Sequence, residues 1–299
     1  MKSERIQAWS RALIFFGIVM LATVMAGIFS SIASMLLFGE MPSMVPGGAL
    51  PTDPASWWNL HMQSFISQAI GFGGAVFICR AMWNGAVPTG MQLLPGTLSP
   101  ASIGLILLMV FAYGPLMAVS YELNVLAIPE GSVLESMFKP LEDMLEKVTA
   151  FLVKGSGIKK VVILISVALV PAVFEELAFR GALQPLLIRA TGKAWVGILL
   201  ASIIFSAIHF QFYGFLPRML LGLLFGWLAY RSSSIIPGMV AHFLNNAGAA
   251  VTFWFTGSMA DDVFPLETWT VLLSLVLTAG AIVGYDRVLK NSRPAETAY

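Results

Sequence analysis

Long apolar runs separated by short polar stretches constrain the fold of this chain more than any other feature. The run Ala12–Phe38 contains no Asp, Glu, Lys or Arg, and about 20 apolar residues suffice for a helix to cross a bilayer. A helix also satisfies its own backbone hydrogen bonds in lipid. We therefore predict an all-α fold, a polytopic membrane helix bundle of about eight transmembrane helices. The candidate spans are Ala12–Phe38, His61–Trp83, Ser102–Ile128, Lys160–Ile188, Ala194–Phe212, Phe215–Tyr230, Ile235–Phe255 and Trp269–Leu289.

Composition supports a membrane protein and excludes several other classes. Hydrophobic residues make up 58% of the 299 residues and charged residues only 11%, whereas soluble domains carry about 25% charged residues. The net charge of +1 offers no basic surplus for nucleic acid. Cys79 is the single cysteine, so a disulfide within the chain and a cysteine-based zinc site are both excluded. The first apolar run is too long for a signal peptide, and we expect it to be a retained membrane helix.

The chain is predicted to form one integrated membrane domain in three parts. Residues 1–157 hold the N-terminal transmembrane helices, a Gly- and Pro-rich loop from Glu40 to Trp58 and an amphipathic segment. Residues 158–256 form the core, and residues 257–299 hold the last transmembrane helix and a basic tail. In the amphipathic segment, apolar residues recur at intervals of three and four, which predicts a helix on the membrane surface. These residues are Val133, Leu134, Met137, Leu141, Met144, Leu145, Val148 and Leu152.

Basic residues near the span ends set the expected orientation, because cytoplasmic loops are enriched in Lys and Arg. An even number of spans puts both termini on one side of the membrane. Most acidic loop residues fall on the opposite side, although Lys139 and Lys147 there weaken the contrast. We expect both termini to be cytoplasmic, and the short loops and basic ends favour a bacterial inner membrane. The basic residues assigned to the cytoplasmic side are Lys2, Arg5, Arg11, Arg80, Arg189, Lys193, Arg231, Arg287, Lys290 and Arg293.

Three charged side chains lie within the apolar run from Val161 to Ile188: Glu175, Glu176 and Arg180. Each costs roughly 2.5 kcal/mol or more at the centre of a membrane helix. Glu176 and Arg180 are four residues apart and share a helical face, which predicts an ion pair. Glu175 lies about 100° around the helix and lacks this partner. It is therefore the carboxylate that remains for chemistry.

Proline and glycine positions add two expectations about helix geometry. Pro171 lies four residues before Glu175, so we expect a kink that frees a backbone carbonyl and opens a water path to this carboxylate. The pattern Gly222-x-x-x-Gly226 predicts close contact between helices. We expect that contact to lie within the monomer rather than between two copies.

The three histidines differ in the strength of their functional signal. His61 lies beside two tryptophans where a loop enters a helix, which favours a structural residue at the membrane interface. An isolated histidine such as His209 is more often packed and hydrogen-bonded than catalytic. His242 and Asn246 are four residues apart and share a helical face. This pair could also hold two helices together, with Asn245 about 60° away.

Glu175, His209, His242 and Asn246 give a stronger signal together than alone. They come from three spans, and ionisable residues within a membrane usually face the bundle interior and one another. One carboxylate and two imidazoles can hold a metal with an open position for water. Equally, Glu175 can act directly as a base on water while a histidine and Asn246 stabilise the oxyanion. Both possibilities lead to hydrolysis inside the membrane, and the residues leave both open.

Two other classes of function are alternatives to hydrolysis. In a proton-coupled membrane transporter, Glu175, Glu176 and the histidines would relay protons, but such proteins often contain internal repeats and none is visible here. A non-catalytic membrane scaffold would have no reason to keep these polar residues at helix-matched spacing.

Three motifs occur in order: Glu175-Glu176-x-x-x-Arg180, Phe205-x-x-x-His209 and His242-x-x-x-Asn246. Together they resemble the motifs of the CAAX prenyl protease and bacteriocin-processing family of intramembrane proteases, also called CPBP or Abi, over about Val161–Trp254. The resemblance implies that Glu175 activates water and that His209 and His242 are catalytic or bind metal. It also implies that Asn246 helps to stabilise the oxyanion, with Glu176 and Arg180 in supporting roles. Every motif position is filled, so we expect an active protease.

The resemblance implies a membrane-associated protein or peptide as substrate. Eukaryotic members remove the last three residues of prenylated CAAX proteins, and bacterial relatives are associated with peptide processing, bacteriocin self-immunity and surface-protein display. We expect a general membrane peptidase rather than a CAAX-specific one. Two mechanisms are possible for such an enzyme. One is a metalloendopeptidase with Zn²⁺ or another divalent metal on Glu175, His209 and His242, and the other is a metal-free glutamate endopeptidase.

Overall fold

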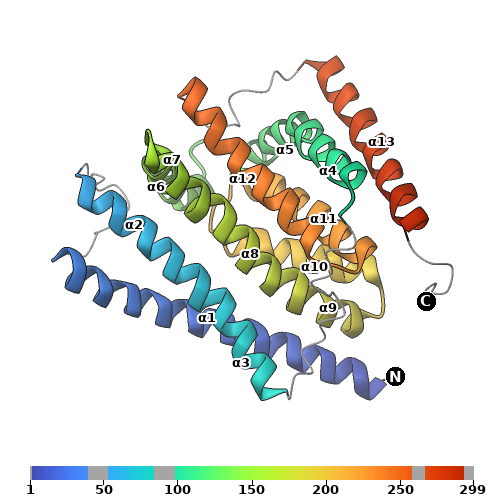
Figure 1. Ribbon diagram of the computed structural model, residues 1–299, viewed down its shortest axis with the longest axis horizontal. Helices are drawn as coiled ribbons and strands as arrows, with labels where there is room; N and C mark the ends of the chain where they lie inside the picture. Colours follow the sequence, from blue (N-terminus) through green and yellow to red (C-terminus); the bar gives the residue numbers. More distant parts are fainter. Residues whose placement is uncertain (1, 40–52, 84–97, 258–266, 293–299) are drawn as a thin grey trace.

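The computed structural model describes residues 2–39, 53–83, 98–257 and 267–292, and these contain helices and no strand. Residues 40–52 of the predicted loop and residues 293–299 of the basic tail lie outside the described residues. The prediction of an all-α membrane bundle is confirmed (Figure 1). In chain order the α-helices are α1 (Lys2–Phe38), α2 (Pro54–Ile66), α3 (Ala75–Met82), α4 (Pro100–Ala112), α5 (Gly114–Leu126), α6 (Val133–Val153), α7 (Ile158–Ile163), α8 (Val170–Glu176), α9 (Gln184–Thr191), α10 (Ala194–Ala207), α11 (Phe215–Ser232), α12 (Ile236–Thr256) and α13 (Thr268–Ser292).

The predicted count of eight membrane spans is not confirmed. Within the described residues, five helical segments are long and apolar enough to cross a membrane, and α10 is apolar but shorter. The two helices that follow α10 are more polar, because α11 carries two arginines and α12 carries a histidine and two asparagines. The predicted fifth span is also too long, since α10 ends at Ala207 and not at Phe212. The five segments are Lys2–Phe38, Pro54–Met82, Pro100–Leu126, Ile158–Thr191 and Thr268–Asn291.

The long segments form a row of neighbours across the view of Figure 1. Helix α1 packs against the segment Pro54–Met82, which packs against α8, and α8 packs against α12. Helix α12 in turn contacts α4, which pairs with α13. The α10–α11 hairpin packs against α9 on one side and against α12 and α5 on the other. The middle of the chain, residues 158–256, therefore lies between the N-terminal helices and the α4–α5–α13 group.

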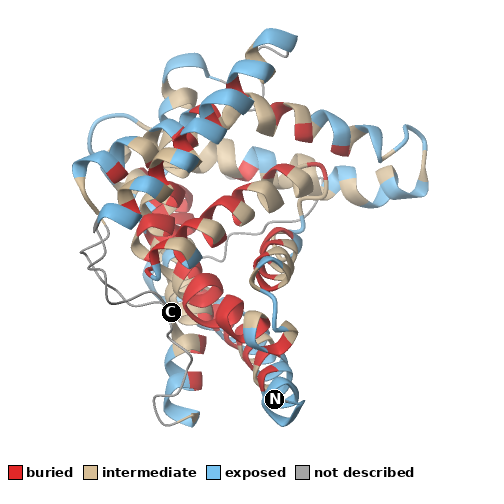
Figure 2. Ribbon diagram, turned by 90° about the vertical axis from the view of Figure 1, so that its right-hand side faces the viewer, coloured by how far each residue is buried: buried red, intermediate tan, exposed pale blue. Residues whose placement is uncertain are grey.

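Buried side chains concentrate in the middle of the bundle, and exposed ones lie toward its ends and outer faces (Figure 2). One buried cluster joins α1 to α10 through residues such as Phe15 and Phe205. A second joins α4 to α11 through Ile106 and Phe225. Outward-facing side chains of α1, such as Leu36, are exposed. An exposed apolar face is expected where a helix meets lipid rather than water.

The segment Ile158–Thr191 is a long helix with two π-helical stretches. Leu164–Leu169 and Leu177–Leu183 have π-helical geometry and flank the α-helical turns of α8. Widened turns of this kind are frequent at functional sites. Here they place the adjacent carboxylates Glu175 and Glu176 between them, in the last turn of α8.

Pro171 leaves a backbone carbonyl of this helix without its usual partner. Proline has no N–H, so the oxygen of Val167, four residues earlier, cannot receive the α-helical hydrogen bond. In the structure, Asn246 Nδ2 donates to Val167 O at 3.2 Å. A side chain from α12 thus donates a hydrogen bond to this carbonyl.

Helix α6 occupies the segment predicted to be amphipathic. Ser132 begins it, with Oγ accepting from Glu135 N at 3.1 Å, as an N-cap does. The C-terminal half packs inward through buried Val148 and contacts α2 and α12. Phe138 stacks on Phe212 with ring centroids 3.9 Å apart. Helix α6 therefore rests on the loop that follows α10.

Candidate active site

Two buried side chains of the long helix, Arg180 and Gln184, donate hydrogen bonds to backbone carbonyls of α11. Arg180 Nη1 donates to Glu176 Oε1 at 2.8 Å, and both side chains are buried, so the ion pair expected from the spacing is present. Arg180 Nη2 also donates to Gly222 O at 3.1 Å. One turn later, Gln184 Nε2 donates to Gly226 O at 3.0 Å. A Cβ at Gly222 would lie 3.0 Å from Ser202 Cβ, and one at Gly226 would lie 2.9 Å from Ile198 Cγ2. The two glycines thus let α11 approach α10 closely within the monomer, as the sequence predicted.

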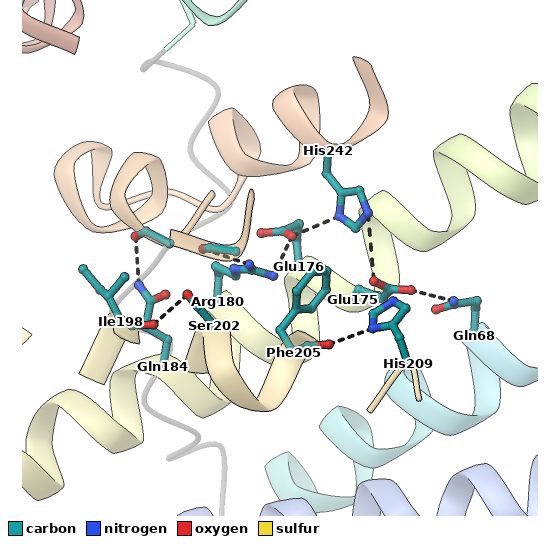
Figure 3. Close-up of polar contacts among 12 residues, drawn as sticks. Gln68, Glu175, Glu176, Arg180, Gln184, Ile198, Ser202, Phe205, His209 and His242 are labelled. Atoms are coloured by element: carbon teal, nitrogen blue, oxygen red, sulfur yellow. Dashed lines mark hydrogen bonds and ion pairs between the residues drawn. The ribbon is translucent and has the colours of Figure 1, made fainter. Parts of the chain in front are cut away.

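His242 connects the Glu176–Arg180 ion pair to the second carboxylate (Figure 3). Its Nδ1 lies 3.1 Å from Glu176 Oε1, and its Nε2 lies 3.9 Å from Glu175 Oε2. The same Glu176 oxygen accepts from Arg180, so in the contact with His242 the donor is Nδ1. The other ring nitrogen, Nε2, is turned toward Glu175. The ring stacks on Phe225 with centroids 5.0 Å apart, which holds this orientation.

Glu175 has one oxygen engaged and one oxygen without a protein partner. Oε1 accepts from Gln68 Nε2 at 2.7 Å. Oε2 is buried and makes no hydrogen bond within the described part of the chain. His242 Nε2 lies 3.9 Å from it, a distance too long for a direct hydrogen bond. A gap of this size suits a bridging water.

His209 approaches the same place from the loop after α10. Its Nδ1 lies 2.7 Å from Phe205 O, a carbonyl that can only accept, so Nδ1 is the protonated nitrogen of the neutral ring. Nε2 is left as an acceptor. The chain turns sharply here, because Phe210 has a φ of 56°, which is uncommon for a residue other than glycine. This loop geometry, rather than continuation of the helix, positions the imidazole.

Asn246 lines the cavity, and its side chain also makes two hydrogen bonds to other parts of the protein. Besides its bond to Val167 O, its Oδ1 accepts from Asn245 Nδ2 at 3.1 Å. A side-chain amide has two N–H groups, so one donor of Asn246 is left after the bond to Val167. Asn246 therefore ties α12 to the long helix and keeps one N–H for a ligand.

These side chains line one cavity of about 410 Å³ between the long helix, α11, α12 and the end of α6. Figure 3 shows Glu175 between His242 and Gln68, with His209 beside it. The structure thus brings together all four residues predicted from the sequence. The lining includes Gln68, Glu175, His209, Arg218, His242, Asn245 and Asn246.

Residues 157–248 match the family model described as type II CAAX prenyl endopeptidase Rce1-like. The match confirms the resemblance found in the three motifs and supports a CAAX-type intramembrane endopeptidase in general. It includes Glu175, His209, His242 and Asn246 but none of α1 to α6. No curated protein and no solved structure gave a significant match.

The predicted metal site fits this cavity in chemistry but not in spacing. Glu175, His209 and His242 offer a carboxylate and two imidazole nitrogens, which are donors that zinc prefers. In the part of the chain that the structure describes, however, no three His, Cys, Asp or Glu side chains are grouped so that they could hold a metal. His242 Nε2 and Glu175 Oε2 are the donors that lie near each other. Metal binding stays a prediction.

Gln68 is the site residue that the sequence analysis missed. It lies in the π-helical stretch Ser67–Gly74, N-terminal to the segment that matches the type II CAAX endopeptidase model. Gly73 brings this stretch against the long helix, because a Cβ there would lie 2.8 Å from the ring of Phe174. A side-chain amide in an apolar span was the available signal, and Gln63 in the same predicted span gives the same signal. The partner of Gln68 could not be found without the packing of the two helices.

We expect Gln68→Met to lower kcat about 10–100-fold while KM changes little. A hydrogen bond to a charged group contributes about 1.5–3 kcal/mol, and each 1.36 kcal/mol corresponds to about tenfold in rate. Gln63→Met is the matched control, because Gln63 lies in α2 and donates to Ser34 Oγ instead. Steady-state kinetics of both variants on one peptide test this, and equal losses would assign Gln68 to packing alone.

His61 lies outside the cavity and has a structural environment. Its Nδ1 lies 2.6 Å from Ser166 Oγ, and its Nε2 lies 3.1 Å from Leu152 O. The ring packs on Trp57 with centroids 4.0 Å apart. His61 thus links α2, α6 and the long helix, and it is buried. Its position at the membrane interface stays a prediction.

Proposed function

We propose that this chain is an intramembrane endopeptidase in which Glu175 activates a water molecule against a peptide bond of a membrane-associated protein or peptide. The observation that carries the proposal is the buried, unpartnered Oε2 of Glu175, 3.9 Å from His242 Nε2 at the wall of the cavity. In this proposal the His242 ring is neutral and carries its proton on Nδ1, so a water placed there can donate to both Glu175 Oε2 and His242 Nε2. Its oxygen lone pairs then face the cavity, where a carbonyl carbon would lie.

The reaction is a general-base hydrolysis. Glu175 Oε2 takes a proton from the water as the oxygen attacks the peptide carbonyl, and the carboxyl group then returns the proton to the leaving nitrogen. His242 Nε2 accepts the second water hydrogen and thereby fixes the direction of attack. The remaining N–H of Asn246 donates to the oxyanion. Glu176 and Arg180 keep the His242 ring oriented and touch none of the reacting atoms.

His209 completes the wall of the site with its Nε2 acceptor. In the metal-free reaction it accepts a hydrogen bond from a substrate N–H. In a metal-dependent reaction it would be the third ligand beside Glu175 and His242, and the cation would polarise the water. Dialysis against a chelator, followed by metal analysis and an activity assay, separates the two mechanisms. Loss of activity that Zn²⁺ restores would favour the second.

We further propose that the protein resides in a bacterial inner membrane with both termini in the cytoplasm. The long apolar helices support the membrane, and the basic residues at the chain ends support the orientation. The substrate is proposed to be a general membrane peptide or protein segment. Accessibility of single cysteines placed near residue 5 and in the loop after α12 would test the orientation.

The test of the function compares new protein termini in membranes of cells that produce wild type or Glu175→Gln at equal levels. We expect a set of termini that depends on wild type and disappears with Glu175→Gln. Glu122→Gln is the matched control, because Glu122 is an exposed glutamate on α5, outside the cavity. It should leave the termini unchanged. Identical termini with all three proteins, each folded and expressed, would contradict the proposal.

A further inference from the structure

A second cavity adjoins the catalytic cavity. It has a volume of about 280 Å³ and lies between α4, α5, α11 and α12. Four residues line both cavities: Arg218, Leu221, Asn245 and Ala249. The two cavities therefore share part of their walls.

The second cavity has a mixed lining. Its unshared part combines apolar residues such as Phe111, Met117 and Leu244 with Tyr113, Tyr121 and Thr252. The shared wall combines Arg218 and Asn245 with Leu221 and Ala249. Ligand sites typically combine an apolar lining with a few polar groups that orient the ligand. The volume of about 280 Å³ lies just below the range of about 300–1,000 Å³ for ligand cavities, which suits one large side chain rather than a whole partner segment.

Gly248 leaves this cavity open. It lies in α12, two residues after Asn246, and lines the second cavity but not the catalytic one. A Cβ added at Gly248 would have no atom within 4 Å. A larger side chain could therefore enter the cavity without displacing protein atoms. The absence of a side chain at this position thus determines how much space a ligand finds there.

We propose that the second cavity is the subsite for an apolar side chain of the peptide substrate next to the scissile bond, and that Gly248 sets the size of the side chain accepted. This inference rests on the proposed peptidase function. Arg218 and Asn245 at the shared wall would contact the peptide backbone, and Phe111, Met117 and Leu244 would contact the apolar side chain. An attached hydrocarbon chain has the same apolar chemistry, so the experiment must distinguish the two sources.

The experiment uses purified full-length protein in lipid–detergent micelles and quenched fluorescent peptides based on a wild-type-dependent cleavage site. Two series carry Ala, Leu or Phe, one series on each side of the scissile bond. A further peptide carries Ala at both positions and an S-alkyl chain on a neighbouring cysteine. We compare wild type, Gly248→Ala and Gly248→Leu. Gly280→Leu in α13 is the matched control, because its Cβ position is equally open and it lines neither cavity.

Only one of the two series places its varied side chain in the second cavity, and the effect is expected in that series. There, Gly248→Leu should lower kcat/KM for the Phe and Leu peptides about 10–100-fold, while the Ala peptide is cleaved as by wild type. Gly248→Ala should give a smaller shift in the same direction and keeps the test informative if the leucine variant fails to fold. Equal losses on all peptides, no change on any, or an effect confined to the S-alkyl peptide would overturn the assignment. If wild type cleaves no peptide while folded, the peptidase function itself fails instead.

Discussion

Replacing Arg180 with alanine is expected to lower the free energy of unfolding by about 3–5 kcal/mol, because Glu176 would be left as a buried charge without its cation. Glu176 and Arg180 are both buried completely or nearly so, and the guanidinium also lies 4.6 Å from the ring centroid of Phe205. Solvent cannot take over either interaction. The measurement is the thermal midpoint of purified protein, together with the amount of folded protein in membranes.

Arg189→Ala is the matched control for this loss. Arg189 lies in the same long helix but is exposed, so its removal should leave stability almost unchanged. A double variant, Glu176→Leu with Arg180→Met, should recover much of the lost stability, because apolar residues can replace a buried ion pair at little cost. Activity should stay low, since His242 loses the carboxylate that orients it. Normal accumulation and stability of Arg180→Ala would show that the ion pair does not hold the fold.

Glu175→Gln is expected to reduce the rate of peptide hydrolysis by about 10²–10⁴-fold, the usual contribution of a positioned general base. The glutamine can keep the bond to Gln68 through its carbonyl oxygen and turn its N–H₂ toward His242. The fold should therefore survive, and the thermal midpoint should stay near that of wild type. The measurement is single-turnover cleavage of a peptide from the termini comparison, with Glu122→Gln as the control.

Glu175→Asp refines this second prediction. It keeps the carboxylate but withdraws it by one methylene group, so partial activity is expected with an unchanged fold. An order of activity of wild type, then Asp, then Gln would indicate that the position of the base matters as well as its charge. Full activity of Glu175→Gln would assign the base to another residue, and His242 would be examined next.

Helical spacing made part of the site predictable. Glu176 and Arg180 share a face over one turn, and the structure has them paired. Pro171 identified Val167 O as the carbonyl that lacks its α-helical hydrogen bond, although not its partner Asn246. These features depend on local geometry, which a sequence determines at short range. His242 was assigned to the site because an ionisable residue in lipid must face the interior.

Other features depended on packing or on irregular backbone. Gln68 reaches Glu175 from a distant segment of the chain, and no local pattern links the two. The end of α10 at Ala207 was missed because the following residues Ile208 and Phe210 continue the apolar run. The π-helical stretches also change the number of residues per turn, so faces counted at about 100° per residue drift across them.

The ion pair within the long helix has a consequence for how the protein enters the membrane. Synthesis proceeds from the N-terminus, so Glu176 and Arg180 leave the ribosome before α11 and α12, which later supply Gly222 O and His242. Because both charges lie on one helix, they neutralise each other as soon as that helix forms. The segment can therefore be inserted as a nearly neutral unit. The contacts to α11 and α12 are then added to a helix already in place, so His242 joins Glu175 and Glu176 last.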